Sequence, residues 1–273
     1  MTSAARAARR SAWADPSAVA RYLADAAAVA QAELIKIRHD PVEMISRATQ
    51  PLLWLLVFGQ VVSRTRAIDT GSLPYEDYLS PGVLAQSAQF SAIFYGLTVI
   101  WERDLGLAHK LLASPAARSA IVLGKALAAG ARALVQALIV YVAALAIGVH
   151  VRLDPISIAA VALVVILGSS LFATFSLVIA CIVRSRERFM GIGQLLTMPL
   201  FFASSAIYPV ELMPGWLQVV ANVNPLTYMV DALRTLMVGG TSSHGLAVDV
   251  SVLAFGAAVL IAIGGRLYPR LAQ

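Results

Sequence analysis

Long apolar runs divide the chain into six candidate membrane-crossing segments. A helix needs about 20 mostly apolar residues to cross the hydrocarbon core of a bilayer. Pro51 lies inside the first run, which is short, whereas the third and fourth runs are long enough to tilt or to project beyond the membrane. The pattern predicts an all-α integral membrane protein whose six transmembrane helices lie between residues 45 and 265 of a single domain spanning 1–273. The runs cover about 45–62, 79–101, 121–148, 156–183, 189–208 and 246–265.

Residues 15–40 carry a helical repeat that is too polar to cross a membrane. Asp15 and Pro16 are typical of a helix start, and Pro41 ends the pattern. We expect an amphipathic helix that lies along the cytoplasmic membrane face. The alternative is a helix that packs on the chain's own cytoplasmic loops. The apolar side chains that recur every three or four residues are Val19, Tyr22, Leu23, Ala26, Ala30, Leu34 and Ile37.

Residues 209–240 are apolar but are broken too often to form one span. Asn224 followed by Pro225 predicts a helix that runs to about Val238 and is closed by Gly239. Two short helices then form either an external lid or a re-entrant hairpin, which is tolerated only where it is buried in protein or lines a wet cavity. Asp231 and Arg234 lie at i and i+3, so we expect them to pair. The candidate external gate comprises Trp216, Asn224, Pro225, Tyr228, Asp231 and Arg234.

Composition and charge support the membrane assignment. The chain of 273 residues is 59% apolar and only 13% charged, whereas soluble domains carry about 25% charged residues. With the N-terminus inside, most of the 21 Lys and Arg residues fall in cytoplasmic segments. The net charge of +6 therefore reads as a topology signal and not as a nucleic-acid surface. We expect a multi-pass protein of the bacterial plasma membrane with both termini cytoplasmic.

Several kinds of chemistry have no visible site in the sequence. Cys181 is the only cysteine, the four histidines are scattered, and no metal site or catalytic residue is expected. A phosphate-binding G-x-x-x-x-G-K-[ST] motif is absent, because Ser119 lies five residues before Gly124 and Ala126 follows Lys125. The chain is thus not expected to hydrolyse ATP. The predicted spans carry no Asp or Glu away from their ends, which disfavours the alternative of an ion-coupled secondary transporter.

Residues 101–125 interrupt the apolar pattern on the cytoplasmic side. Residues 103–113 fit a short helix with Leu105, Leu111 and Leu112 as apolar contacts, ended by Ser114 and Pro115. Ser119 is the expected cap of the next helix. Periodicity alone does not separate a helix that binds a partner from an ordinary surface loop.

The order of residues in this segment resembles the cytoplasmic loop of ABC-2-type exporter membrane subunits, in particular the daunorubicin-resistance-like group. The matching features are Glu102-Arg103-Asp104, Gly106, Leu111-Leu112, Ser114-Pro115 and Gly124-Lys125, in that order. The stretch "NPLTYMVDALR" at 224–234, after Pro209 and "PGW" at 214–216, is similar to the family's last external loop. One departure is Leu107-Ala108-His109, where many members carry an acid.

The resemblance implies a permease subunit of an ATP-driven exporter for a hydrophobic or amphipathic compound. It implies that the chain binds no cofactor, and that ATP and Mg²⁺ are held by a separate ATPase subunit present in two copies. It also implies a second membrane subunit, either a copy of this chain or a paralogue, in contact with membrane lipid. Residues 101–118 would be the coupling helix, with Leu111 and Leu112 in an apolar groove of the ATPase and Glu102 and Asp104 paired with basic groups. The implied contact residues are Glu102, Arg103, Asp104, Gly106, His109, Lys110, Leu111, Leu112, Ser114 and Pro115.

Aromatic and amide side chains in the first, second and fifth spans are candidates for the substrate pathway. Such a mixture suits an amphipathic cargo, but polar side chains also hold membrane helices together. Arg132 lies about 10 Å along its helix from Lys125 and is expected to reach the headgroups or to face a cavity. The candidate pathway residues are Gln50, Trp54, Gln86, Gln89, Phe90, Phe94, Thr197, Phe201 and Phe202.

Overall fold

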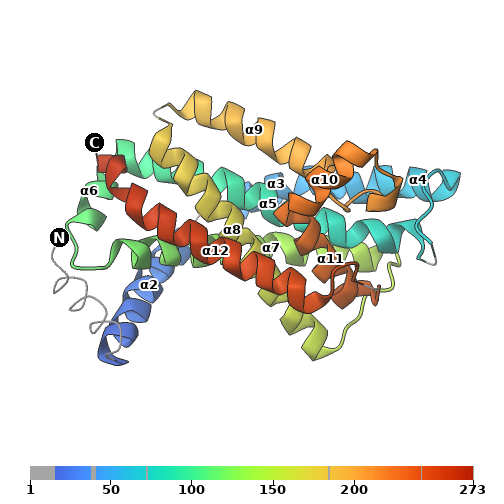
Figure 1. The fold of residues 1–273 in the computed structure, drawn as a ribbon, viewed down its shortest axis with the longest axis horizontal. Helices are drawn as coiled ribbons and strands as arrows, with labels where there is room; N and C mark the ends of the chain where they lie inside the picture. Colours follow the sequence, from blue (N-terminus) through green and yellow to red (C-terminus); the bar gives the residue numbers. More distant parts are fainter. Residues whose placement is uncertain (1–15, 38–40, 72, 184, 241, 273) are drawn as a thin grey trace.

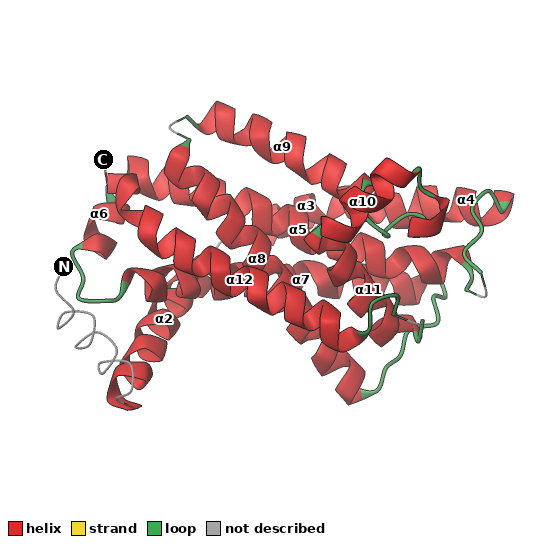
Figure 2. Ribbon diagram, viewed as in Figure 1, coloured by secondary structure: helices red, strands yellow, loops and turns green. Residues whose placement is uncertain are grey.

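The computed structural model describes residues 16–37, 41–71, 73–183, 185–240 and 242–272, and within them all regular structure is helical (Figures 1 and 2). The prediction of an all-α protein is confirmed for this part of the chain. The α-helices are α2 (Pro16–Ile37), α3 (Pro41–Leu53), α4 (Gln60–Thr65), α5 (Tyr75–Asp104), α6 (Leu107–Leu112), α7 (Arg118–Ala146), α8 (Pro155–Ile182), α9 (Arg186–Phe202), α10 (Gly215–Val223), α11 (Pro225–Val238) and α12 (Leu246–Leu267).

Four helices in the described part are long and apolar enough to cross a membrane. They are α5, α7, α8 and α12, the last of which continues into the short helix η3 (Tyr268–Ala272) at the C-terminal end. Helices α5, α7 and α8 pack against one another at the centre of the bundle, and α12 packs against α8 and α7 from outside. They correspond to the predicted second, third, fourth and sixth spans.

The predicted first and fifth spans are present as less regular or shorter helices. The first is α3 followed by a π-helical turn, η1 (Trp54–Gly59), and α4, and Pro51 lies just before that turn. The fifth is α9, which has 17 residues and contains Pro199. Proline removes a backbone donor and clashes with the preceding turn, which fits the irregular turn that follows Pro51. The count of six transmembrane helices stays a prediction.

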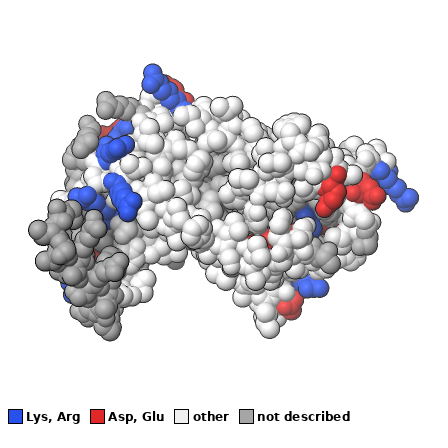
Figure 3. All heavy atoms as spheres, in the orientation of Figure 1, with Lys and Arg blue, Asp and Glu red and all other residues white. Residues whose placement is uncertain are grey.

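The two ends of the bundle differ. In Figure 1, α2, α6 and η3 lie at one end of the long axis, and α4, α10 and α11 lie toward the other. On the face drawn in Figure 3, Lys and Arg are visible at both ends, whereas most of the visible Asp and Glu lie at the end opposite α6. Acidic residues therefore accompany the basic ones at that end.

Helix α2 leaves the bundle obliquely and packs across α7 (Figure 1). The contact is close because α7 has glycine at 124, where an added Cβ would lie 2.5 Å from the carbonyl oxygen of Ala26. Ala26 and Glu33 are buried on this face, whereas Val19 and Leu23 remain exposed. One face of α2 therefore packs on α7 and not on a cytoplasmic loop, and the position of the helix along the membrane face stays a prediction. Asp15, the expected cap, lies outside the described residues.

Capping residues set the limits of two helices, α8 and α11. Asp154 accepts a hydrogen bond from the amide of Ser157 at the start of α8, which lowers the pKa of its carboxyl. Asn224 caps the start of α11. Gly239, with φ +76°, follows the last residue of the same helix, as the sequence predicted. The expectation for Ser119 is wrong, because α7 begins at Arg118, one residue earlier.

Candidate functional site

The 101–118 segment folds as the end of α5, a turn and the short helix α6. Asp104 ends α5, and Gly106 turns the chain with φ +73°, a value that favours glycine. Ser114 donates its hydroxyl to the carbonyl of Leu111 at 2.7 Å and closes α6. The single helix expected at 103–113 is therefore wrong, because the left-handed turn at Gly106 separates two helices.

Among the large apolar side chains that the structure describes in this segment, Leu105 is the most exposed, at 71%. Leu111 and Leu112, expected to insert together into a partner, are half-buried and pack against the protein's own core. The side chains of His109 and Lys110 lie outside the described part of the structure. The turn at Leu105 thus offers a partner an exposed apolar side chain at this end, close to the half-exposed Trp101.

The charged residues of the segment divide into a surface set and a buried set. At the surface, Asp104 accepts hydrogen bonds from Arg103 at 3.0 Å and from Arg186 at 2.7 Å, so it ties the end of α5 to the start of α9. Arg186 also lies over the ring of Trp101, 4.9 Å from its centroid. Asp104 remains one-third exposed and accessible to a partner.

Glu102 belongs to the buried set and is turned away from the surface. The ammonium of Lys125 lies 2.5 Å from a carboxylate oxygen of Glu102 and 3.1 Å from one of Glu33. All three side chains are almost fully buried. The expectation that Glu102 pairs with a partner subunit is therefore not met in this structure, because Lys125 already neutralises it inside the protein.

Arg132 extends the same cluster. Its guanidinium lies 4.0 Å from a carboxylate oxygen of Glu33 and 5.3 Å from the ring centroid of Tyr95. It thus faces buried groups of α2 and α5, so neither expected position, at the headgroups or in an open cavity, describes it. Sequence reasoning did not find that Lys125 pairs with Glu33 and Glu102, or that Arg132 lies near Glu33. The available signal was the spacing of Lys125 and Arg132, seven residues apart on one face of a helix.

The expected pathway residues separate into a groove and an interior group. Trp54 lies 5.6 Å from Phe201 and 6.0 Å from Phe202 between ring centroids. Beside these rings, a largely apolar groove of about 520 Å³ is lined by Gln50, Leu53, Trp54, Val57, Phe58 and Val61. The structure therefore brings Gln50 and Trp54 to one accessible surface, with the two phenylalanines next to it.

The other expected pathway residues lie away from this groove. Gln86 and Gln89 are buried, and Thr197 donates its hydroxyl to the carbonyl of Gly193 within its own helix. Phe90 and Phe94 contact each other along α5, with ring centroids 4.6 Å apart. In the arrangement seen here, these side chains contribute to helix packing.

The 209–240 segment folds into η2 (Val210–Leu212), α10 and α11 at the end opposite α6. Asn224 holds the segment in place, because its amide donates to the carbonyls of Leu200 at 2.7 Å and Ala203 at 2.8 Å. Tyr228 donates its hydroxyl to the carbonyl of Asn222 at 2.6 Å, whereas Trp216 is 70% exposed.

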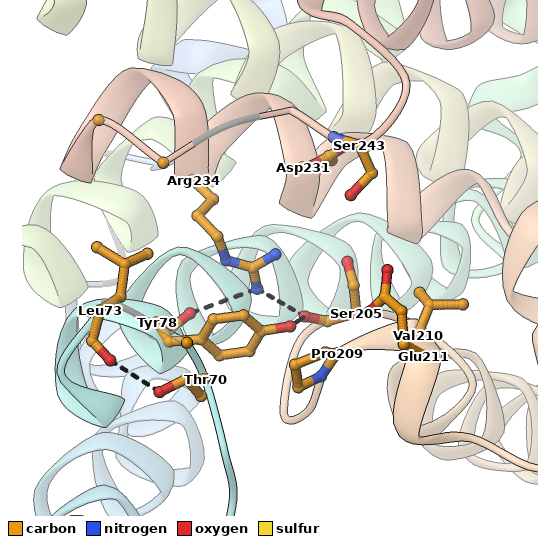
Figure 4. Close-up of a pocket in the computed structure, with 13 residues that line it drawn as sticks. Thr70, Leu73, Tyr78, Ser205, Pro209, Val210, Glu211, Asp231, Arg234 and Ser243 are labelled. Carbon is orange, nitrogen blue, oxygen red and sulfur yellow. Dashed lines mark hydrogen bonds between the residues drawn. The ribbon is translucent and has the colours of Figure 1, made fainter.

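Asp231 and Arg234 do not form the expected pair. Arg234 donates to the carbonyls of Tyr78 at 3.4 Å and Ser205 at 2.6 Å, and its guanidinium stacks 3.7 Å from the ring centroid of Tyr78 (Figure 4). Asp231 instead accepts the backbone amide of Ser243 at 2.8 Å. The helical spacing allowed the pair, but each side chain found closer partners in other segments.

A group that sequence reasoning missed lies where α11 meets the loop before α12. Asp231, His244 and Asp249 each offer a potential metal ligand, within 4.8 Å of one another. The hydroxyl oxygen of Ser242 lies 3.2 Å from a carboxylate oxygen of Asp231 and 3.0 Å from one of Asp249, so it can donate to either. Hydrogen bonds to the loop therefore already account for the position of Asp231.

Comparison with known proteins extends these observations. Residues 25–238 match the family model described as ABC-2 type transporter. The putative transport permease ycf38 of Cyanophora paradoxa is 28% identical over 208 residues, which cover 74% of this chain and 70% of the relative. The daunorubicin resistance ABC transporter permease protein DrrB1 of Streptomyces coeruleorubidus is 24% identical, over 86% of this chain and 82% of the relative. The probable doxorubicin resistance ABC transporter permease protein DrrC of Mycobacterium tuberculosis is 25% identical, over 85% of each chain.

Proposed function

Because the chain belongs to the ABC-2 type transporter family, we propose that it is the membrane subunit of an ATP-driven exporter. A separate ATPase subunit hydrolyses ATP with Mg²⁺ and docks at the end of the bundle formed by α2, α6 and η3. The observation that carries this assignment is the exposed turn at Leu105, which offers an apolar side chain beside the charged group of Arg103, Asp104 and Arg186. Such a combination suits docking to another subunit.

The proposed topology places this end in the cytoplasm of a bacterial cell. Six elements cross the plasma membrane: the α3–η1–α4 segment, α5, α7, α8, α9 and α12. Helices α10 and α11 then form a re-entrant hairpin or lid on the external side. The basic residues of the segments placed inside, among them Arg103, Arg118 and Arg186, support this orientation, because basic residues are retained on the cytoplasmic side.

The proposed cargo is a hydrophobic or amphipathic compound such as a drug, a lipid or a lipid-linked molecule. Two observations support this class: the apolar groove next to Trp54, Phe201 and Phe202, and the resistance proteins named among the relatives. Two membrane subunits enclose the route, and the second is a copy of this chain or a paralogue.

The decisive experiment measures which energy source drives transport. The tagged subunit is purified from its native membrane together with its bound proteins, and the complex is reconstituted in vesicles with a fluorescent amphipathic dye. We expect an ATPase to co-purify, and dye movement to require ATP and Mg²⁺ and to persist when a protonophore collapses the proton gradient. Transport that follows an ion gradient without ATP would establish the ion-coupled alternative instead.

A further inference from the structure

A second cavity, of about 350 Å³, opens at the end of the bundle opposite α6 (Figure 4). Its walls come from the turn before α5, the beginning of α5, the segment from Ser205 to Glu211, and the end of α11. This space is about ten times the ~30 Å³ that a water molecule occupies in the liquid. It is therefore large enough for a polar group the size of a phospholipid headgroup.

Arg234 carries a buried positive charge beside this cavity. The side chain is 6% exposed, and its Nη2 donates to the carbonyls of Tyr78 and Ser205. In the described part of the chain, no carboxylate lies within ion-pair distance of Arg234, and Nε has no acceptor. A buried guanidinium without a carboxylate is costly, which favours binding of an anionic group.

Ser205 adds a second donor at the same wall. Its Oγ is buried and has no hydrogen-bond partner among the residues that the structure describes. Its carbonyl already accepts from Arg234 and from the hydroxyl of Tyr78 at 3.0 Å, so the backbone is fixed while the hydroxyl is unused. A guanidinium together with a hydroxyl is a suitable donor set for phosphate oxygens.

Two carboxylates line the same cavity and restrict what can enter. Glu211 is exposed, and Asp231 is buried with one oxygen occupied by the loop at Ser243. A simple anion would be repelled by these two carboxylates, and a simple cation would leave the buried guanidinium of Arg234 without an anionic partner. A ligand that carries both signs satisfies all three groups at once.

We propose that this cavity binds a zwitterionic phosphoethanolamine group, with its phosphate at Arg234 and Ser205 and its ammonium at Glu211 and Asp231. The group can be presented by free phosphoethanolamine or by the headgroup of a phospholipid. This proposal concerns the membrane subunit alone, so it stands or fails independently of the ATPase and of the transported compound.

Calorimetric titration of the purified subunit in detergent, without ATPase, tests the site. The probes are O-phosphoethanolamine, inorganic phosphate and ethanolamine, compared at the same pH and ionic strength. We expect phosphoethanolamine to bind about tenfold or more tightly than either half alone. Equal binding by phosphate alone would overturn the role of the carboxylates, and no binding by any probe, soluble or lipid, would overturn the site.

Short-chain lipids then distinguish the two sources of the group. Dihexanoyl phosphatidylethanolamine is compared with dihexanoyl phosphatidylglycerol, which has a similar phosphate but no ammonium. Tighter binding of the ethanolamine lipid than of free phosphoethanolamine assigns the site to a headgroup, and equal affinities assign it to the soluble compound. A preference for the glycerol lipid would contradict the proposal.

Substitutions separate a binding role from a structural one. Ser205→Ala removes a hydroxyl that has no protein partner among the described residues, so it should weaken phosphoethanolamine binding about threefold or more without lowering the melting temperature of the free protein. Glu211→Gln should weaken phosphoethanolamine binding and tighten phosphate binding about twofold, because repulsion of the anion is removed. Arg64→Gln, at an exposed arginine outside the cavity, is the control. The proposal is wrong if Ser205→Ala and Glu211→Gln both bind every probe as the parent does.

Discussion

Lys125 on α7 lies 2.5 Å from Glu102, the residue two positions before the end of α5. The same ammonium binds Glu33 of α2 at 3.1 Å. One buried cation thus joins three helices at the end of the bundle that we propose binds the ATPase. Because Leu105 follows the last turn of α5, this cluster links the proposed docking turn to α2 and α7.

Removing the cation should destabilise the protein strongly. Lys125→Met leaves Glu33 and Glu102 buried without their shared partner, which costs about 3–5 kcal/mol when a buried ion pair is broken on one side. Thermal unfolding of the detergent-purified subunit measures this loss. The variant that adds Glu33→Gln and Glu102→Gln to Lys125→Met should recover much of the stability, because the two side chains that bind Lys125 then carry no charge. A single Lys125→Met variant as stable as the parent would contradict the cluster.

Replacing Leu105 should separate ATPase docking from folding. Leu105→Asp places a charge on a side chain that is 71% exposed, so the free subunit should keep its melting temperature within about 1 °C. At a docking surface the same charge becomes buried, so co-purification of the ATPase should fall at least about tenfold. Leu153→Asp, at an exposed leucine 61% accessible outside the segment, is the control. If the ATPase co-purifies with Leu105→Asp as it does with the parent protein, the ATPase docks elsewhere than at this turn.

The boundaries of the helices were predictable where one residue type has a specific local role. Asn224 and Pro225 started α11 at the expected residue, because a capping side chain followed by proline satisfies the free amides of a helix start. The long apolar runs likewise became α5, α7, α8 and α12. These features depend on neighbours in the sequence, so the sequence alone contains the necessary information.

The contacts between distant segments were not predictable in this way. Glu102 lies beside Arg103 and Asp104 in a charged stretch typical of an exposed loop, yet it is buried because α2 supplies Glu33 and α7 supplies Lys125. Asp231 and Arg234 were expected to pair from their helical spacing. Instead, Asp231 accepts a hydrogen bond from the amide of Ser243, and Arg234 donates one to the carbonyl of Ser205. Such partners are set by helix packing, which periodicity does not determine.

The close contact between α2 and α7 should depend on the absence of a side chain at position 124. In Gly124→Val the new Cβ would lie 2.5 Å from the carbonyl of Ala26 and 2.7 Å from Cβ of Val29, so α2 must move. We expect the melting temperature to fall by several degrees and α2 to exchange its amide hydrogens faster. Gly191→Val is the matched control, because nothing lies within 4 Å of its added Cβ. Equal effects of the two substitutions would mean that helix propensity, and not this contact, decides the outcome.

The proposed topology predicts opposite accessibility at the two ends of the bundle. Single cysteines at Ser114 and Trp216, both exposed, are introduced into a Cys181→Ala background and labelled in intact cells with an impermeant thiol reagent. We expect labelling at position 216 only, and labelling at position 114 only after the membrane is permeabilised. The reverse pattern would invert the orientation and place α6 outside.

Asp231 and Arg234 should behave as members of two separate contacts. Asp231 holds the loop before α12 through Ser242 and Ser243, so Asp231→Ala should loosen that loop and speed hydrogen exchange over 242–245. Arg234 holds the segment at Ser205, so Arg234→Gln should loosen that segment instead. Because no hydrogen bond joins the two side chains, a double-mutant cycle should show only the weak coupling of neighbouring opposite charges, below about 1 kcal/mol. The cycle of Asp231→Ala with Ser242→Ala supplies the positive control and should show a coupling of about 1 kcal/mol, since these side chains share a hydrogen bond at 3.2 Å. A coupling above about 1 kcal/mol between positions 231 and 234 would show instead that the two charges pair when the protein is in its membrane.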